Sequence, residues 1–232
     1  MLRGKYTIYA TRAKEIDDYI SSIKEDLKHD IIVGAIVMNC NPFTLGHKYL
    51  IEKAIAKVDY LYIFIVEEDK SFFHFSDRLQ LVKDGVSDIK GRIKVVPSGK
   101  FIISGTTFKD YFSKESNQKI INPSNDVMIF GAMIAPHLNV SYRFLGEEPS
   151  CQVTSQYNAS LAKLLPELGI NVEIIPRLQQ NGLAISASRV RKLLSEKNFI
   201  DLSPLVPKST FDYLFANQAS LISRLEMQFD KP

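Results

Sequence analysis

The sequence predicts an α/β fold in which a parallel sheet carries helices on both faces. Residues 31–38 form a continuous apolar run rich in β-branched side chains, which is typical of a strand buried on both faces. Residues 47–58 place apolar side chains at helical spacing, and residues 60–66 form a second apolar run. A strand, a helix and a second strand in this order make a crossover unit with parallel strands. We therefore expect a Rossmann-like sheet.

The rest of the chain continues this alternation. Residues 1–30 are charged and show a helical pattern, which predicts a helical or linker extension ahead of a main domain at residues 31–232 that ends in C-terminal helices. Further helices are expected at 75–88, from Asn125 to near Pro136, and at 155–165, 187–196 and 209–226. Further strands are expected at 93–96, 140–145 and 172–175, whereas 98–125 receive no assignment.

Composition excludes several classes of function. The 232 residues are 45% hydrophobic and 24% charged, which suits one large globular domain. The net charge of +3 comes without a dense Lys/Arg run, so no nucleic-acid partner is expected. Cys40 and Cys151 lack metal-ligand spacing, so neither a metal site nor a disulfide is expected. No apolar run is long enough to span a membrane and no secretory signal begins the chain, which predicts a cytoplasmic protein without a membrane partner.

The first candidate functional segment, Asn41–His47, joins a predicted strand to a predicted helix. Ligands of open α/β sheets bind outside the carboxyl ends of the strands, and a helix N-terminus favours phosphate. Gly46 would let a phosphate approach the main chain, while Thr44 and His47 would donate hydrogen bonds to it. The alternative is an ordinary loop that is capped by Thr44 and leaves His47 on the surface.

The second candidate segment, Ile185–Arg191, opens another predicted helix. Ser186 suits the N-cap, and Ser188 and Arg191 lie on one helical face because they are three residues apart. A hydroxyl, a guanidinium and free main-chain N–H groups together suit a polyphosphate. The alternative is a capped amphipathic helix whose arginines are solvated.

Both segments resemble signatures of one enzyme superfamily. Thr44-Leu45-Gly46-His47 resembles the [T/H]xGH motif of the HIGH-type nucleotidyltransferases, with Thr in place of the His of many members, and Ile185–Arg191 resembles their ISxSxxR motif. A longer resemblance identifies the chain as similar to the citrate lyase ligases. It extends through residues 34–47, 68–73, 143–149, 154–158, 184–191 and 204–207.

The resemblance implies an enzyme that uses ATP with Mg²⁺. Acetate would attack the α-phosphate to form acetyl-adenylate and pyrophosphate, and the acetyl group would then pass to the thiol of the citrate lyase acyl carrier protein. Family members usually carry an acetyltransferase-like domain ahead of this one, which residues 1–30 are too few to contain. An adenylyl- or cytidylyltransferase acting on a phosphorylated small molecule, for surface polysaccharide or cofactor synthesis, therefore stays an alternative. A non-catalytic nucleotide sensor is another. The acceptor, the choice between ATP and CTP, and the oligomeric state, a homo-oligomer included, stay open.

The resemblance and the two segments together assign roles to individual residues. The expected catalytic residues are His47, Thr44 and Arg191. The expected nucleotide-binding residues are Asn41, Pro42, Phe43, Gly46, Gly146, Tyr157, Ile185, Ser186 and Ser188. The expected substrate-binding residues are Lys70, Phe72 and Arg78, with a solvated Lys70, a core role for Phe72 and an ion pair from Arg78 to Asp77 or Asp84 as alternatives.

Overall fold

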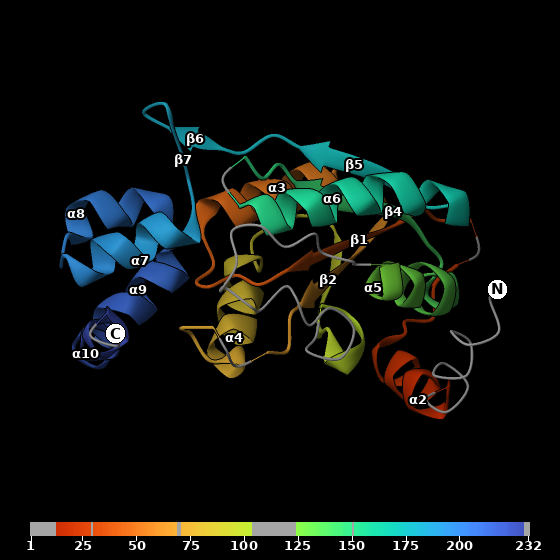
Figure 1. The fold of residues 1–232 in the computed structure, drawn as a ribbon, viewed down its shortest axis with the longest axis horizontal. Helices are drawn as coiled ribbons and strands as arrows, with labels where there is room; N and C mark the ends of the chain where they lie inside the picture. Colours follow the sequence, from red (N-terminus) through yellow and green to blue (C-terminus); the bar gives the residue numbers. More distant parts are fainter. Residues whose placement is uncertain (1–12, 29, 69–70, 104–123, 150, 230–232) are drawn as a thin grey trace.

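A five-stranded parallel sheet forms the centre of the protein (Figure 1). The computed structural model describes residues 13–28, 30–68, 71–103, 124–149 and 151–229. The strand order is β3-β2-β1-β4-β5. The strands are β1 (Val33–Met38), β2 (Tyr60–Ile65), β3 (Arg92–Pro97), β4 (Val140–Gly146) and β5 (Asn171–Ile175). All four neighbouring pairs are parallel, which confirms the predicted α/β fold.

The connections place a ligand-binding edge between β1 and β4. Helix α3 (Leu45–Ile55) leads from β1 to β2, helix α4 (Phe75–Gly85) leads to β3, and helix α6 (Gln152–Leu164) leads from β4 to β5. The strand order therefore reverses between β1 and β4. In open α/β sheets the crevice at such a reversal, outside the carboxyl ends of the strands, is where ligands bind.

Helices cover both faces of the sheet. One core contains side chains of α6, of the short helix α5 (Ser124–Met128) with its π-helical continuation Ile129–Ile134, and of α2 (Ala13–Ile23). The opposite core is formed under α3 and α4. Because α2 buries Ile16, Ile20 and Ile23 in the first core, the described part of the expected N-terminal extension packs as part of the same hydrophobic unit.

Four C-terminal helices form a third apolar cluster at one end of the molecule (Figure 1). These are α7 (Ala187–Ser195), α8 (Phe199–Leu202), α9 (Lys208–Ala216) and α10 (Gln218–Phe229). The last two were expected as one helix. The break falls at Asn217, where the side-chain Nδ2 donates to the carbonyl of Tyr213 at 2.8 Å.

A small hairpin precedes α7 and was not predicted from the sequence. Its strands are β6 (Gln179–Gln180) and β7 (Leu183–Ala184), which pair antiparallel. The turn between them consists of Asn181 and Gly182, both at positive φ, which is the turn chemistry that suits a two-residue hairpin. Among the described helices, none has the length and apolar character that a membrane span requires.

Candidate active site

Buried side chains hold the loop between β1 and α3 against the core. Phe43 has no exposed surface and lies against Gly85 of α4, where an added Cβ would come within 2.6 Å of two atoms of the Phe43 ring. Pro42, which follows a cis peptide bond, is also buried. The expected contacts of Pro42 and Phe43 with a nucleotide therefore need correction, since these side chains hold the loop in place and do not reach its outer surface.

Thr44 and His47 form a reciprocal cap at the start of α3. The His47 main-chain N–H donates to Thr44 Oγ1 at 3.4 Å, and the Thr44 main-chain N–H donates to His47 Nδ1 at 3.0 Å. A main-chain N–H can only donate, so Nδ1 must carry a lone pair. The neutral ring therefore carries its proton on Nε2, which is left to donate to a ligand.

The surroundings of His47 favour this neutral form. Burial and, to a smaller extent, the positive charge of Arg177 lower the pKa of the His47 imidazole to about 4. The ring also stacks on Phe43, with centroids 5.8 Å apart and an interplanar angle of 14°. His47 thus presents a fixed, uncharged N–H donor at the N-terminus of α3 near neutral pH.

Arg78 ties together three segments at the carboxyl ends of β1 and β2. Its Nη1 donates to the carbonyls of Asn39 (2.8 Å) and Val66 (2.9 Å), its Nη2 to the carbonyl of Glu68 (2.8 Å), and its Nε to the carbonyl of Phe73 (3.1 Å). The side chain is fully buried. The structure therefore corrects the expected substrate contact, because the Arg78 guanidinium binds main-chain carbonyls that shape the site.

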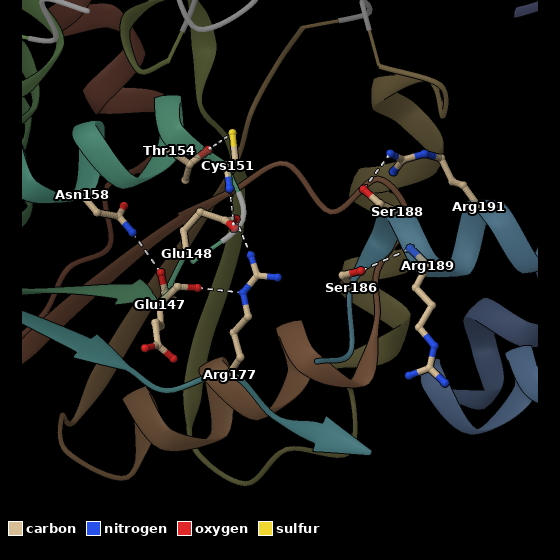
Figure 2. Close-up of polar contacts among 11 residues, drawn as sticks. Glu147, Glu148, Cys151, Thr154, Asn158, Arg177, Ser186, Ser188, Arg189 and Arg191 are labelled. Atoms are coloured by element: carbon tan, nitrogen blue, oxygen red, sulfur yellow. Dashed lines mark hydrogen bonds and ion pairs between the residues drawn. The ribbon is translucent and has the colours of Figure 1, made fainter. Parts of the chain in front are cut away.

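The second segment begins α7 in the expected way. Ser186 is the N-cap, and its Oγ accepts from the Arg189 main-chain N–H at 3.2 Å. Ser188 Oγ accepts from Arg191 Nη2 at 3.2 Å, so the hydroxyl and the guanidinium lie together as predicted (Figure 2). Burial lowers the pKa of Arg191, which nevertheless stays a cation near neutral pH.

Direct contacts join the two segments, which lie about 140 residues apart in the chain. Arg191 Nη1 donates to the carbonyl of Asn41 in the first loop. A Cβ on Gly46 would lie 2.9 Å from the carbonyl oxygen of Ile185. Gly46 therefore admits the main chain of the second segment, where the sequence suggested the approach of a phosphate. The two segments form one site.

The loop after β4 forms the opposite side of the site. Gly146 ends β4, and its carbonyl accepts from Asn158 Nδ2 at 3.0 Å. Tyr157 instead points into the core, where its hydroxyl donates to Asp126 Oδ2 at 2.6 Å. The expected contact of Tyr157 with a nucleotide therefore needs correction, whereas Gly146 lies at the ligand-binding edge.

Arg177 is a charged residue of this region to which the sequence assigned no role. It follows β5, its Nε donates to the Glu147 carbonyl at 2.8 Å, and its Nη2 pairs with the Glu148 carboxylate (Figure 2). Its positive charge is the second cause, after burial, of the lowered pKa of His47. The available signal was its position just after a predicted strand, where parallel sheets present side chains to ligands.

Phe72, another expected substrate residue, lies in the core. Phe72 is 4% exposed and packs edge-on against Phe73, with ring centroids 4.8 Å apart. Arg224 of α10 lies over the Phe72 ring and donates to the Phe72 carbonyl at 2.5 Å. Phe72 thus takes the core role that was its alternative. Lys70 lies outside the described residues.

The donors collected here suit an anion. They comprise a neutral imidazole N–H, hydroxyls, guanidinium groups and the N-termini of α3 and α7. Within the part of the chain that the structure describes, no three His, Cys, Asp or Glu side chains converge in a way that could hold a metal ion. The arrangement can therefore bind a polyphosphate and stabilise negative charge that develops on it.

Comparison with known proteins agrees with this fold and with the family resemblance of the sequence. A family model described as the citrate lyase ligase C-terminal domain matches residues 33–214. A [citrate [pro-3S]-lyase] ligase of Escherichia coli is 44% identical over 91% of this chain and 61% of its own length. A ligase of the same name from Klebsiella pneumoniae is 39% identical over 78% of this chain and 54% of its own length. The chain thus spans little more than half the length of these relatives.

A solved structure supports the fold at a greater distance. A Vibrio parahaemolyticus protein assigned as a nicotinate-nucleotide adenylyltransferase superposes with a TM-score of 0.51 at 14% identity, over 81% of this chain and 93% of that one. The protein therefore has the α/β fold found among nucleotidyltransferases. From the match over residues 33–214, the chain belongs to the citrate lyase ligase family, in the part that forms the C-terminal domain.

Proposed function

We propose that this chain activates acetate with ATP and passes the acetyl group to the citrate lyase acyl carrier protein. The observation that carries the proposal is the joining of the two segments. Arg191 of the second segment donates to Asn41 of the first, and both helix starts lie where the sheet order reverses. The relatives are named as citrate lyase ligases, and this name supports the citrate lyase carrier protein as the destination of the acetyl group, although the chain spans only part of their length.

In the first step, an acetate oxygen attacks the α-phosphorus of ATP. The bond from that phosphorus to the oxygen bridging the β-phosphate breaks, and pyrophosphate leaves with the electron pair. Such a displacement needs positioning and charge stabilisation more than covalent help from the protein. His47 Nε2–H donates to the α-phosphate oxygens, while Ser188 and Arg191 hold the β- and γ-phosphates. Mg²⁺ would enter on these phosphates and partly neutralise the leaving group.

In the second step, the carrier thiol, as thiolate, attacks the acetyl carbon of acetyl-adenylate. The bond from that carbon to the phosphate oxygen breaks and AMP leaves, while the thiol proton passes to solvent. No protein cysteine takes part in this scheme. Cys40 is buried, and burial raises the pKa of its thiol, which makes it a poor nucleophile.

The test measures pyrophosphate release from ATP with Mg²⁺, with and without acetate, and traps acetyl-adenylate with hydroxylamine as acetohydroxamate. We expect acetate-dependent release that is lost in His47→Asn. His137→Asn is the matched control, because His137 is exposed and lies just before β4, at the opposite edge of the sheet. If pyrophosphate is released without acetate, or only from CTP with a sugar or polyol phosphate, then acetate is not the acceptor. One of the alternative acceptors would take its place.

A further inference from the structure

Arg177 is held rigidly but with part of its guanidinium unused. Two of its three nitrogens are occupied, Nε by the Glu147 carbonyl and Nη2 by the Glu148 carboxylate. The side chain is 22% exposed and that of Glu148 is 14% exposed. A half-buried guanidinium fixed at two points loses little further freedom when it binds a third group.

The unused nitrogen lies on the side of the site. In Figure 2 the Arg177 guanidinium lies between the loop that carries Glu147 and Glu148 and the helix that carries Ser188 and Arg191. No polar atom of the Arg177 side chain is both buried and without a hydrogen-bond partner. Among the described residues, the structure gives hydrogen bonds from Nε and Nη2 alone, so Nη1 is a donor that a ligand can reach.

We propose that Arg177 is a further phosphate-binding residue, which contacts the ATP triphosphate from the side opposite Arg191. The inference rests on the proposed nucleotide site but does not depend on which acceptor attacks. Its position after β5 places it at the carboxyl edge of the sheet, next to the reversal between β1 and β4. Arg177 and Arg191 would then hold the nucleotide from two separate elements.

The same charge has a second effect at this site. Arg177 repels a proton on His47 and so helps to keep the ring neutral. Glu148 limits this effect, because the carboxylate partly neutralises the guanidinium. A phosphate that approaches Arg177 therefore meets a cation whose geometry is set in advance by its partners in the β4 loop.

The experiment measures the binding of ATP, pyrophosphate and adenosine by calorimetry, without acetate. In Arg177→Gln we expect ATP and pyrophosphate affinity to fall about 10- to 100-fold, on the scale of a lost charge-assisted hydrogen bond, while adenosine affinity stays unchanged. The matched control is Arg92→Gln, since Arg92 is exposed at the start of β3, away from the site. The pKa of His47, followed by NMR titration, should also rise in Arg177→Gln and not in the control.

The outcomes separate the inference from the proposed function. Unchanged pyrophosphate affinity in Arg177→Gln, or an equal loss for adenosine and ATP, would overturn the role of Arg177. If Arg177→Gln shows the selective loss but the wild-type protein releases no pyrophosphate with acetate, acetate is not the acceptor and the role of Arg177 stands. If Arg177→Gln unfolds, the double variant Glu148→Gln with Arg177→Gln leaves no unpaired carboxylate and should show the same selective loss.

Discussion

The substitution His47→Asn separates the two tasks of this histidine. Asparagine places its Oδ1 where the imidazole has Nδ1, so the Thr44 main-chain N–H, now 3.0 Å from Nδ1, keeps an acceptor. No atom of asparagine replaces Nε2, so the donor to the α-phosphate is lost. The variant therefore retains the helix cap and removes the proposed catalytic contact.

The magnitudes follow from these two contacts. Loss of one donor to a developing charge lowers turnover by about 10²- to 10³-fold, or about 2.7–4 kcal/mol. The free energy of unfolding should fall by about 1 kcal/mol in His47→Asn, because the imidazole no longer packs on the Phe43 ring although the hydrogen bond from the Thr44 main-chain N–H survives. In His47→Ala the side-chain acceptor of the Thr44 main-chain N–H is lost as well, which adds a destabilisation of about 1 kcal/mol, whereas the bond from the main-chain N–H of residue 47 to Thr44 Oγ1 remains.

The assay pairs pyrophosphate release under saturating ATP and acetate with urea unfolding of the same preparations. His47→Asn should be catalytically as poor as His47→Ala but more stable. Turnover in His47→Asn within about threefold of wild type would correspond to well under 1 kcal/mol of transition-state stabilisation and would refute the role of Nε2. Equal instability of the two variants would refute the capping contact.

Three further predictions test the surroundings of the site. The folded pKa of His47, about 4, is below the unfolded value near 6.5, so the unfolded chain binds the proton more readily, and stability should fall as pH drops from about 6.5 towards 4. Urea unfolding at several pH values measures this, and His47→Asn should show a shallower fall. Arg78→Lys should lower the free energy of unfolding by about 3 kcal/mol, because lysine cannot satisfy all the buried carbonyls, and a loss below about 1 kcal/mol in guanidinium unfolding would contradict this. Gly46→Ala should cost about 1–3 kcal/mol of stability and weaken ATP binding, since the new Cβ would lie 2.9 Å from the Ile185 carbonyl oxygen. The stability control is Gly146→Ala, whose Cβ would meet nothing closer than 3.6 Å, so equal melting temperatures for the two variants would contradict the steric argument.

Much of the fold was predictable because its signals are local. The apolar runs that became β1 and β2, and the helix between them, lie within about three residues of their expected bounds. The cap at Ser186 was expected and the cap at Thr44 was the stated alternative, since an N-cap depends on residues only three positions apart. The break between α9 and α10 was missed, because no Gly or Pro marks it.

The roles of buried residues were the least predictable part of the site. A sequence does not show whether Arg78 faces a substrate or the main chain, and the structure places it against four carbonyls from three segments. Tyr157 and Phe43 were expected at the nucleotide, yet both are buried among partners far away in the chain. Arg177 was overlooked because its partners Glu147 and Glu148 lie about 30 residues earlier.

The sequence by itself determined the class of fold, the two helix starts that suit phosphate, and the family, because each depends on residue types at short spacing. Only the tertiary structure decided that these helix starts form one site, through the Arg191–Asn41 hydrogen bond and the close approach of Ile185 to Gly46. It also decided the protonation of His47, because burial and the charge of Arg177 act through space and not along the chain.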